Sequence, residues 1–220
     1  MIFSTFETSW ELNQALAERI ANDLKNLLEI KEHIYILVSG GSTPKTLFPV
    51  LSKLDVNWKK ITIGLVDERY VENTSEFSNE KLVRETLLQN HAKEATFLPM
   101  VVNPSDEKAN TAAVSASYAV FSNPDLVLLG MGEDGHTASI FPNDSGSELA
   151  LTSAENCLAT QAPVHPKQRI TCTAHILNQA VRTYLTITGE KKKTVFENAA
   201  QKELPIAAFT KIITEVFYTK

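Results

Sequence analysis

Short apolar runs that stop abruptly at glycine or polar residues recur along the chain. The three clearest, 34–38, 61–66 and 126–129, are rich in leucine, isoleucine and valine at successive positions. Such continuous runs are typical of strands that are buried on both faces of a parallel sheet, because helices cover both sides of the sheet. We therefore predict that these three segments are buried parallel strands.

The segments between these runs have the periodicity of helices. Leucine or isoleucine recurs every fourth residue from 12 to 28, and Thr8 and Glu11 have capping-box spacing, which predicts a helix over 9–29. Further helices are expected over 79–90, in an Ala/Ser-rich stretch ending near 121, at 176–180 and after 189. Further strands are expected over 95–100, 156–161, 170–173, 184–188, 206–210 and 212–218. The stretch 143–148 is expected to be a polar loop. Strands alternating with helices, without repeats or a linker, predict a single α/β domain over 1–220 with a mostly parallel sheet.

Each of the three apolar runs is followed directly by residues that can carry chemistry. SGGSTP occupies 39–44, DER occupies 67–69, and GMGEDGHTAS occupies 130–139. Right-handed crossovers bring the carboxyl ends of parallel strands to one edge of the sheet, which is where ligands of open α/β sheets bind. We expect these three segments to converge on one site.

The turn that follows residue 129 is the strongest candidate for catalysis. Asp134 and His136 stand two residues apart in a turn that contains three glycines. A carboxylate and an imidazole can transfer protons or orient each other. The alternative is a glycine-rich turn with a surface histidine. The position of the turn after a buried strand favours the catalytic interpretation.

The segment SGGSTP is a candidate anion cradle. The adjacent Gly40 and Gly41 let the backbone approach a ligand closely, and the start of the next helix attracts negative charge. The paired hydroxyls of Ser39 and Ser42 favour a phosphate or sugar oxygen, while Thr43 is expected to cap the helix and Pro44 to take its first position. The pattern is neither the Walker motif nor GxGxxG, so nucleotide binding is not indicated. A plain strand-to-helix turn is the alternative.

Charged residues at three other places are candidates for binding. Asp67 and Arg69 follow a buried strand, and Lys167 and Arg169 share one side of the chain if the Pro-containing segment around them is extended. Three successive lysines, with Lys192 in the middle, open a helix where cations oppose the macrodipole unless an anion is near. For each group the alternative is a solvated loop or charge run.

Composition sets further bounds on the class of protein. The net charge is −5 and the pI is near 5.6, which does not support nucleic-acid binding. The two cysteines, Cys157 and Cys172, have no metal-ligand spacing and are expected to be small core residues. The sequence has neither a signal-peptide pattern nor an apolar run of membrane-spanning length, so we expect a soluble, cytoplasmic protein without membrane partners.

Together these motifs resemble the family of 6-phosphogluconolactonases and glucosamine-6-phosphate isomerases. The matching segments are SGGSTP at 39–44, DER at 67–69, SN at 78–79, GMGEDGHTASIFP at 130–142, KQRIT at 167–171 and TGEKK at 188–192, in the family's order. The resemblance implies a Rossmann-like α/β fold and hydrolysis of 6-phospho-D-glucono-1,5-lactone in the oxidative pentose phosphate pathway. It also implies that there is no metal or organic cofactor.

The resemblance also implies roles for individual residues. His136 matches the general base, with Asp134 beside it. The residues expected to bind the substrate are Gly40, Gly41, Ser42, Thr43, Asp67, Arg69, Lys167, Arg169 and Lys192. A neutral imidazole can take a proton from water and return it to the departing ring oxygen, and arginine binds two phosphate oxygens at once. Whether Asp134 orients His136 or faces the sugar hydroxyls is open at this point.

Two other functions compete with lactone hydrolysis. Deaminases of glucosamine 6-phosphate share SGGSTP and DGH, but they usually have DEY rather than DER and continue DGHIAFNEP, so Arg69 and the Thr137–Ser139 segment favour the lactonase. A non-catalytic sugar-phosphate sensor would not need His136. The expected partner is a small phosphorylated lactone, with no nucleic acid, and the expected state is a monomer or weak dimer.

Overall fold

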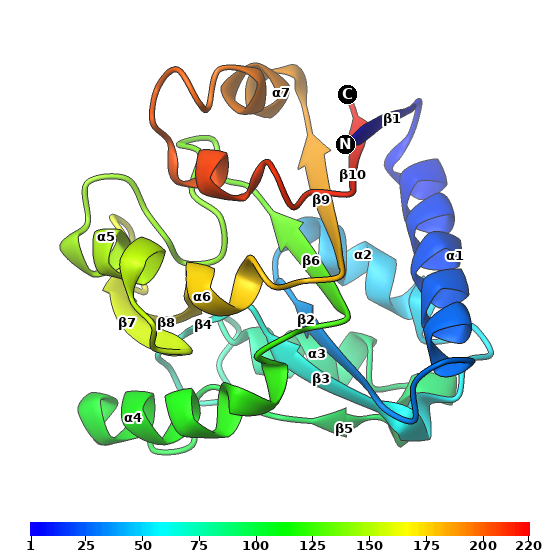
Figure 1. Cartoon of the computed structure of the whole chain (residues 1–220), viewed down its shortest axis with the longest axis horizontal. Helices are drawn as coiled ribbons and strands as arrows, with labels where there is room; N and C mark the ends of the chain where they lie inside the picture. Colours follow the sequence, from blue (N-terminus) through cyan, green and yellow to red (C-terminus); the bar gives the residue numbers. More distant parts are fainter.

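The computed structural model describes residues 1–220 and contains a seven-stranded sheet that runs through the molecule (Figure 1). Its strands, in spatial order, are β1 (Ile2–Phe6), β10 (Glu215–Thr219), β9 (Arg182–Thr188), β6 (Leu126–Gly130), β2 (Ile34–Val38), β3 (Ile61–Leu65) and β5 (Thr96–Phe97). All neighbouring pairs are parallel. The predicted α/β fold with a mostly parallel sheet is confirmed.

The centre of this sheet is buried as its apolar pattern predicts. All five residues of β3 are buried, and β3 pairs with β2 from Ile34 opposite Ile61 onward. Packing above Gly64 is so close that an added Cβ would lie 2.6 Å from the ring of Phe121. The surrounding hydrophobic cluster contains 50 buried residues, which give the sheet edges a rigid support.

Seven α-helices and four short 3₁₀ helices connect the strands. The α-helices are α1 (Ser9–Leu28), α2 (Ser42–Leu51), α3 (Asn79–Thr86), α4 (Glu107–Ser117), α5 (Ser145–Thr152), α6 (Ala174–Leu177) and α7 (Glu190–Glu197), and the 3₁₀ helices are Trp58–Lys60, Asn90–Glu94, Tyr118–Phe121 and Pro205–Phe209. The predicted capping box starts α1, since Thr8 and Glu11 exchange two hydrogen bonds of 3.2 Å. None of the helices has the length and apolar character that crossing a membrane requires.

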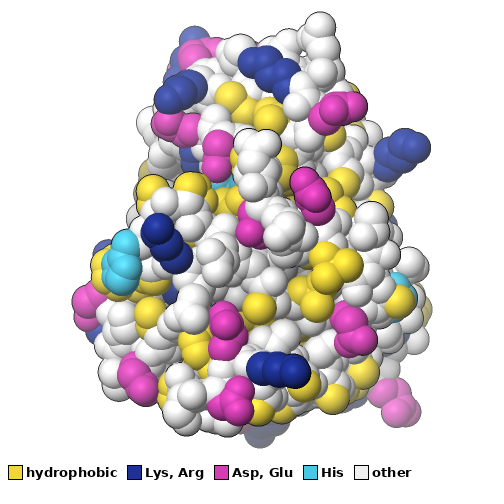
Figure 2. All heavy atoms as spheres, turned by 90° about the vertical axis from the view of Figure 1, so that its left-hand side faces the viewer, with side chains coloured by type: hydrophobic (Ala, Val, Ile, Leu, Met, Phe, Trp, Pro, Cys, Tyr) yellow, Lys and Arg dark blue, Asp and Glu magenta, His cyan; other side chains and the backbone are white.

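A second sheet lies beside the first. The strands predicted over 156–161 and 170–173 are confirmed and belong to it, but its third strand and its separation from the first sheet are not predicted by the sequence pattern. This second sheet contains β4 (Asp67–Arg69), β8 (Gln168–Cys172) and β7 (Cys157–Gln161), all antiparallel. Helices α4 and α5 pack against β7, and the two cysteines are free and buried, as expected. Figure 2 shows this side of the molecule, where acidic and basic side chains are interspersed.

Two expectations for individual segments are wrong, and one strand is missed. The polar stretch at 143–148 contains the start of α5, because the carboxylate of Asp144 accepts a hydrogen bond from the Ser147 amide and caps the helix. The apolar stretch at 206–210 forms a 3₁₀ helix rather than a strand, which buries Ile206 and Phe209 on one side. The edge strand β1 has no counterpart among the predicted elements.

Candidate active site

A cavity of about 670 Å³ opens at the carboxyl edge of the parallel sheet. The turns after β2, β3 and β6 all reach it, so the predicted convergence of SGGSTP, DER and DGHTAS is confirmed. Its lining is mostly polar and includes Ser39, Gly40, Gly41, Ser42, Thr43, Asp67, Arg69, Asn79, Gly132, Asp134, His136, Phe141, Arg169, Thr186, Thr188 and Lys192. Ten of the eleven residues proposed from the sequence lie in this lining. The exception is Lys167.

The turn after β2 presents bare backbone to the cavity. An added Cβ on Gly40 would lie 1.9 Å from the side-chain oxygen of Asn79, so only glycine fits there. Gly41 has φ +110° and is the N-cap of α2, without a side-chain cap. Thr43 therefore does not cap the helix, and Pro44 is its third residue rather than its first. Because Gly41 offers no capping side chain, the first amides of α2 stay available to an anion.

Ser39 adds a buried hydroxyl to this turn. Its side chain is only 5% exposed, and its Oγ has no hydrogen-bond partner in the protein. A buried hydroxyl without a partner costs free energy, and such groups call for a specific explanation. Because Ser39 lines the cavity, a ligand oxygen is the natural partner of this hydroxyl.

Two arginines face each other on the small sheet. Arg69 of β4 and Arg169 of β8 are directly opposite in the antiparallel register, and both line the cavity. Burial, and then the charge of Arg69, lower the pKa of the Arg169 guanidinium. The Arg69 Nε is also buried without a partner. Like charges placed opposite each other on neighbouring strands destabilise a sheet, and an anion between them would offset this repulsion.

The two acidic residues of the DER segment have different surroundings. The Asp67 carboxylate lines the cavity and accepts a hydrogen bond of 2.5 Å from the Ser139 hydroxyl. Glu68 points away and accepts hydrogen bonds from the backbone amides of Asn79 and Glu80, which fixes β4 to the start of α3. Burial raises the pKa of Glu68 to about 7, against the opposing effect of these amides. Glu68 is therefore a structural residue, and Asp67 faces the ligand space.

The turn after β6 holds an imidazole against a carboxylate. The Asp134 Oδ1 lies 2.5 Å from His136 Nδ1 and also accepts a hydrogen bond of 3.1 Å from the His136 amide. An added Cβ on Gly132 would lie 2.2 Å from two atoms of the imidazole, so glycine at this position makes room for the ring. Since Nδ1 is occupied by Asp134, Nε2 is the ring nitrogen left for a reactant.

The electrostatics of this pair follow from partial exposure. The side chains of His136 and Asp134 are 33% and 39% exposed. Burial alone would raise the pKa of Asp134, but the hydrogen bond and charge of His136 outweigh burial and lower it. Asp134 is therefore an ionised carboxylate in direct contact with Nδ1 of the imidazole.

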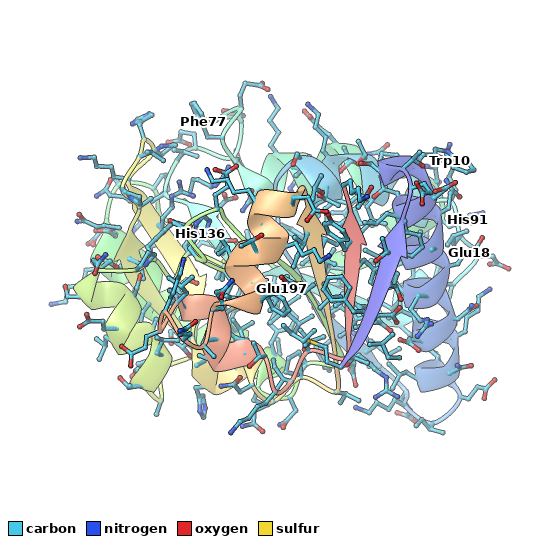
Figure 3. The ribbon with its side chains drawn as sticks, turned by 90° about the horizontal axis from the view of Figure 1, so that it is seen from above. Trp10, Glu18, Phe77, His91, His136 and Glu197 are labelled. Atoms are coloured by element: carbon cyan, nitrogen blue, oxygen red, sulfur yellow. The ribbon has the colours of Figure 1, made fainter.

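One aromatic ring lies beside both ends of the site. The centroid of Phe141 is 4.7 Å from that of the His136 ring and 5.8 Å from the guanidinium carbon of Arg169. In Figure 3, His136 lies beside α7, while Trp10 and His91 lie on the far side of the molecule. The imidazole and the arginine pair therefore belong to one site and can act on one small molecule.

The three lysines at the start of α7 have different contacts. Lys191 forms an ion pair with Glu133, and the ammonium of Lys193 lies 5.2 Å from the centre of the Tyr218 ring. Lys192 has no hydrogen-bond or ion-pair partner in the protein and lines the cavity. Lys192 is therefore the lysine of the three that is available to an anion.

Lys167 lies elsewhere. It is exposed, precedes the start of β8 at Gln168, and does not line the cavity, so it does not share the side of Arg169 as the alternation of an extended chain predicts. Several lining residues have no assigned role in the sequence prediction, among them Thr186, Thr188 and Phe141. The two threonines could be found from their position, since they end a strand at the same edge. Phe141 gives no such signal.

A parallel α/β sheet with an imidazole and basic side chains gathered at its carboxyl edge defines an enzyme of the Rossmann-like class. The family model described as glucosamine-6-phosphate isomerases/6-phosphogluconolactonase matches residues 7–218. The chain belongs to this family.

Similar proteins agree with this assignment. The 6-phosphogluconolactonase of Neisseria meningitidis serogroup A is 38% identical, with 92% of this chain and 89% of the relative covered. That of Helicobacter pylori strain 26695 is 35% identical, with coverage of 98% and 96%. The crystal structure of a 6-phosphogluconolactonase from Shewanella baltica superposes with a TM-score of 0.95 at 37% identity, with 100% and 98% covered.

Proposed function

We propose that the chain hydrolyses 6-phospho-D-glucono-1,5-lactone to 6-phospho-D-gluconate, as in the oxidative pentose phosphate pathway. The relatives named 6-phosphogluconolactonase support this substrate. The observation that carries the proposal is the placement of a carboxylate-supported imidazole, His136, in the same cavity as the facing arginines, Arg69 and Arg169. One end can activate water, and the other can hold a phosphate.

The phosphate belongs at the basic end. A phosphate dianion between Arg69 and Arg169 would remove their mutual repulsion and give the buried Arg69 Nε an acceptor. Lys192 and the uncapped start of α2 add further positive charge from other sides of the cavity. This arrangement favours a doubly charged terminal group over a neutral one.

The lactone carbonyl belongs near His136. Nε2 takes a proton from a water molecule while the water oxygen attacks C1, and the carbonyl electrons move onto the carbonyl oxygen. When the tetrahedral intermediate collapses, the bond between C1 and the ring oxygen breaks, and His136 returns its proton to that oxygen. Asp134 holds the ring and stabilises the imidazolium in between. No covalent enzyme intermediate is required, because a lactone is an activated ester.

Asp67 suits the sugar hydroxyls. The Ser139 hydroxyl occupies its Oδ2, which leaves Oδ1 to accept a hydrogen bond from a substrate hydroxyl. Ser39 can contribute its unpartnered hydroxyl from the neighbouring turn. Both residues would position the ring without taking part in proton transfer.

The decisive experiment compares three reactions with the purified protein. We expect hydrolysis of the phosphorylated lactone well above its spontaneous rate, weak hydrolysis of unphosphorylated glucono-1,5-lactone, and no deamination of glucosamine 6-phosphate. Deamination without lactone hydrolysis would overturn the proposal. Equal kcat/KM for the two lactones would show that the basic end does not recognise phosphate.

A further inference from the structure

The guanidinium groups of the arginine pair are each fixed to a different loop. Arg69 Nη1 donates a hydrogen bond of 2.7 Å to the carbonyl oxygen of Phe77, in the loop between β4 and α3. Arg169 Nε donates a hydrogen bond of 2.9 Å to the carbonyl oxygen of Pro166, in the loop between β7 and β8. The directions in which the two side chains present their remaining N–H groups therefore depend on where these loops lie.

The two loops are in contact beside the cavity, which Pro163 and Val164 of the second loop line. The rings of Phe77 and His165 are in edge-to-face contact, with centroids 5.8 Å apart and planes at 90°. Phe77 is the residue whose carbonyl holds Arg69, and His165 precedes the residue whose carbonyl holds Arg169. The ring contact thus connects the loop that holds Arg69 to the loop that holds Arg169.

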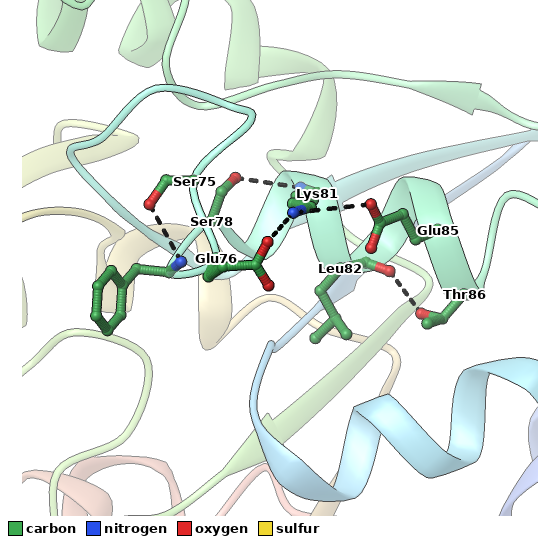
Figure 4. Close-up of polar contacts among 8 residues, drawn as sticks. Ser75, Glu76, Ser78, Lys81, Leu82, Glu85 and Thr86 are labelled. Carbon is green, nitrogen blue, oxygen red and sulfur yellow. Dashed lines mark hydrogen bonds and ion pairs between the residues drawn. The ribbon is translucent and has the colours of Figure 1, made fainter.

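The two loops differ in how firmly they are held elsewhere. Around Phe77, the Ser75 hydroxyl accepts a hydrogen bond from the Phe77 amide, and Glu76 pairs with Lys81 of α3 (Figure 4). Between residues 163 and 166 of the other loop, the bond from Arg169 is the only hydrogen bond. The 163–166 loop is closed at its base by a hydrogen bond of 2.8 Å from the Ala162 amide to the Lys167 carbonyl oxygen, and beyond this base the ring contact ties it to the Phe77 loop.

Both rings are exposed to solvent although they contact each other. Phe77 is 48% exposed, and His165 is also exposed. Exposed large apolar side chains that lie next to binding groups often mark a functional site. Here the ring contact joins the two loops whose carbonyl oxygens hold a half-buried and a buried arginine, Arg69 and Arg169.

We propose that Phe77 and His165 form a clasp that positions Arg69 and Arg169 for the phosphate of the substrate. The proposal rests on the proposed function, in that the bound group is the phosphate of a sugar lactone. Opening the clasp leaves the 163–166 loop held only at its base, so the guanidinium of Arg169 is directed less firmly towards the phosphate. The proton-transfer end stays unchanged, because Asp134 holds His136 independently of both loops.

The test uses Phe77→Ala and His165→Ala in the full chain, with KM and kcat measured for both lactones. We expect the KM for the phosphorylated lactone to rise about fivefold in each variant, in keeping with the value of an aromatic pair, with kcat within twofold of wild type. The KM for unphosphorylated glucono-1,5-lactone should not change. The double variant should show no further rise, because either single change already opens the clasp. His165→Phe keeps an aromatic ring at this position and should therefore keep the wild-type KM.

Two exposed residues on the far side of the molecule provide matched controls. Trp10→Ala removes an aromatic ring that is 69% exposed, and His91→Ala removes an exposed imidazole (Figure 3). Both should leave the KM for either lactone unchanged. The clasp is excluded if the KM values of the Phe77 and His165 variants match those of these controls, or if KM rises equally for both lactones. It is also excluded if the two increases in KM add in the double variant. A wild-type protein that does not prefer the phosphorylated lactone would instead contradict the proposed function.

Discussion

The large parallel sheet and the small antiparallel sheet both reach the cavity, but they supply different kinds of groups. The parallel sheet supplies turns at strand ends, where glycines such as Gly40 and Gly132 let backbone and imidazole approach a ligand. The antiparallel sheet supplies the side chains of Arg69 and Arg169 from within paired strands. We propose a division in which proton transfer depends on the first sheet alone, while most of the affinity for phosphate comes from the arginines of the second.

The largest effect is expected from removing the base. His136→Ala should lower kcat for the phosphorylated lactone about 1,000-fold with little change in KM, because proton transfer is lost while the arginines remain. The variant His175→Ala, at an exposed position of α6, is the matched control. The kcat and KM of both variants are measured by steady-state kinetics after subtraction of the spontaneous rate of hydrolysis. An unchanged kcat would show that His136 is not the base, and it would contradict the proposal that the parallel sheet provides the proton transfer.

The next largest effect tests the antiparallel sheet. Arg169→Ala should raise the KM for the phosphorylated lactone about 100-fold, since a charge-assisted contact to phosphate is lost, and should hardly affect the unphosphorylated lactone. Arg182→Ala, at an exposed arginine at the start of β9, is the control. A fall in kcat without a rise in KM would show that the arginine acts in the chemical step instead.

A smaller effect is expected from filling the space beneath the imidazole. In Gly132→Ala the new methyl would lie 2.2 Å from Cε1 and Nδ1 of His136, so the ring must move away from its position against Asp134. We expect kcat to fall about 30-fold, because small displacements of a catalytic group are costly. The midpoint of thermal unfolding should stay within a few degrees, since the atoms in conflict belong to side chains. Loss of both activity and folding would mean that the turn itself is disrupted.

The smallest effect concerns the titration of Asp134. His136 lowers the pKa of this carboxyl, so the pair stabilises the folded protein above the ordinary pKa of an aspartate, and this stabilisation is lost as the pH falls through the lower folded value. The contribution is a few tenths of a kcal/mol, because both groups are partly exposed. In His136→Ala, carbon-detected NMR of the aspartate carboxyl should show a higher pKa. An unshifted titration would mean that the two side chains do not interact in solution.

The parallel sheet could be predicted because its strands are continuous apolar runs, and the cavity could be predicted because polar turns follow those runs. Two strands of the antiparallel sheet, β7 and β8, could also be predicted, but β4 and the pairing of the three strands could not. The DER segment looks like a solvated loop, but Asp67 and Glu68 are buried, because distant residues such as Ser139 and Asn79 supply them with hydrogen bonds. Local pattern contains no information about such partners.

The errors at Lys167 and at 206–210 have related causes. The rule of alternation applies only inside a strand, and Lys167 lies one residue before β8 begins. At 206–210, an apolar stretch this short suits a strand or a single helical turn, and the buried pair Ile206 and Phe209 has helical spacing. Neither outcome could be decided without knowing the surrounding packing.

The facing arginines have a consequence for how the protein is handled. If two like charges are brought together for a phosphate, then any phosphate ion in the solvent binds the folded protein in preference to the unfolded chain. At ten times its Kd, such an ion adds about 1.4 kcal/mol to the free energy of unfolding. Inorganic phosphate should therefore act as a stabilising ligand and a competitor of the substrate, and stability and KM measured in phosphate buffer should both be higher than in a buffer without it.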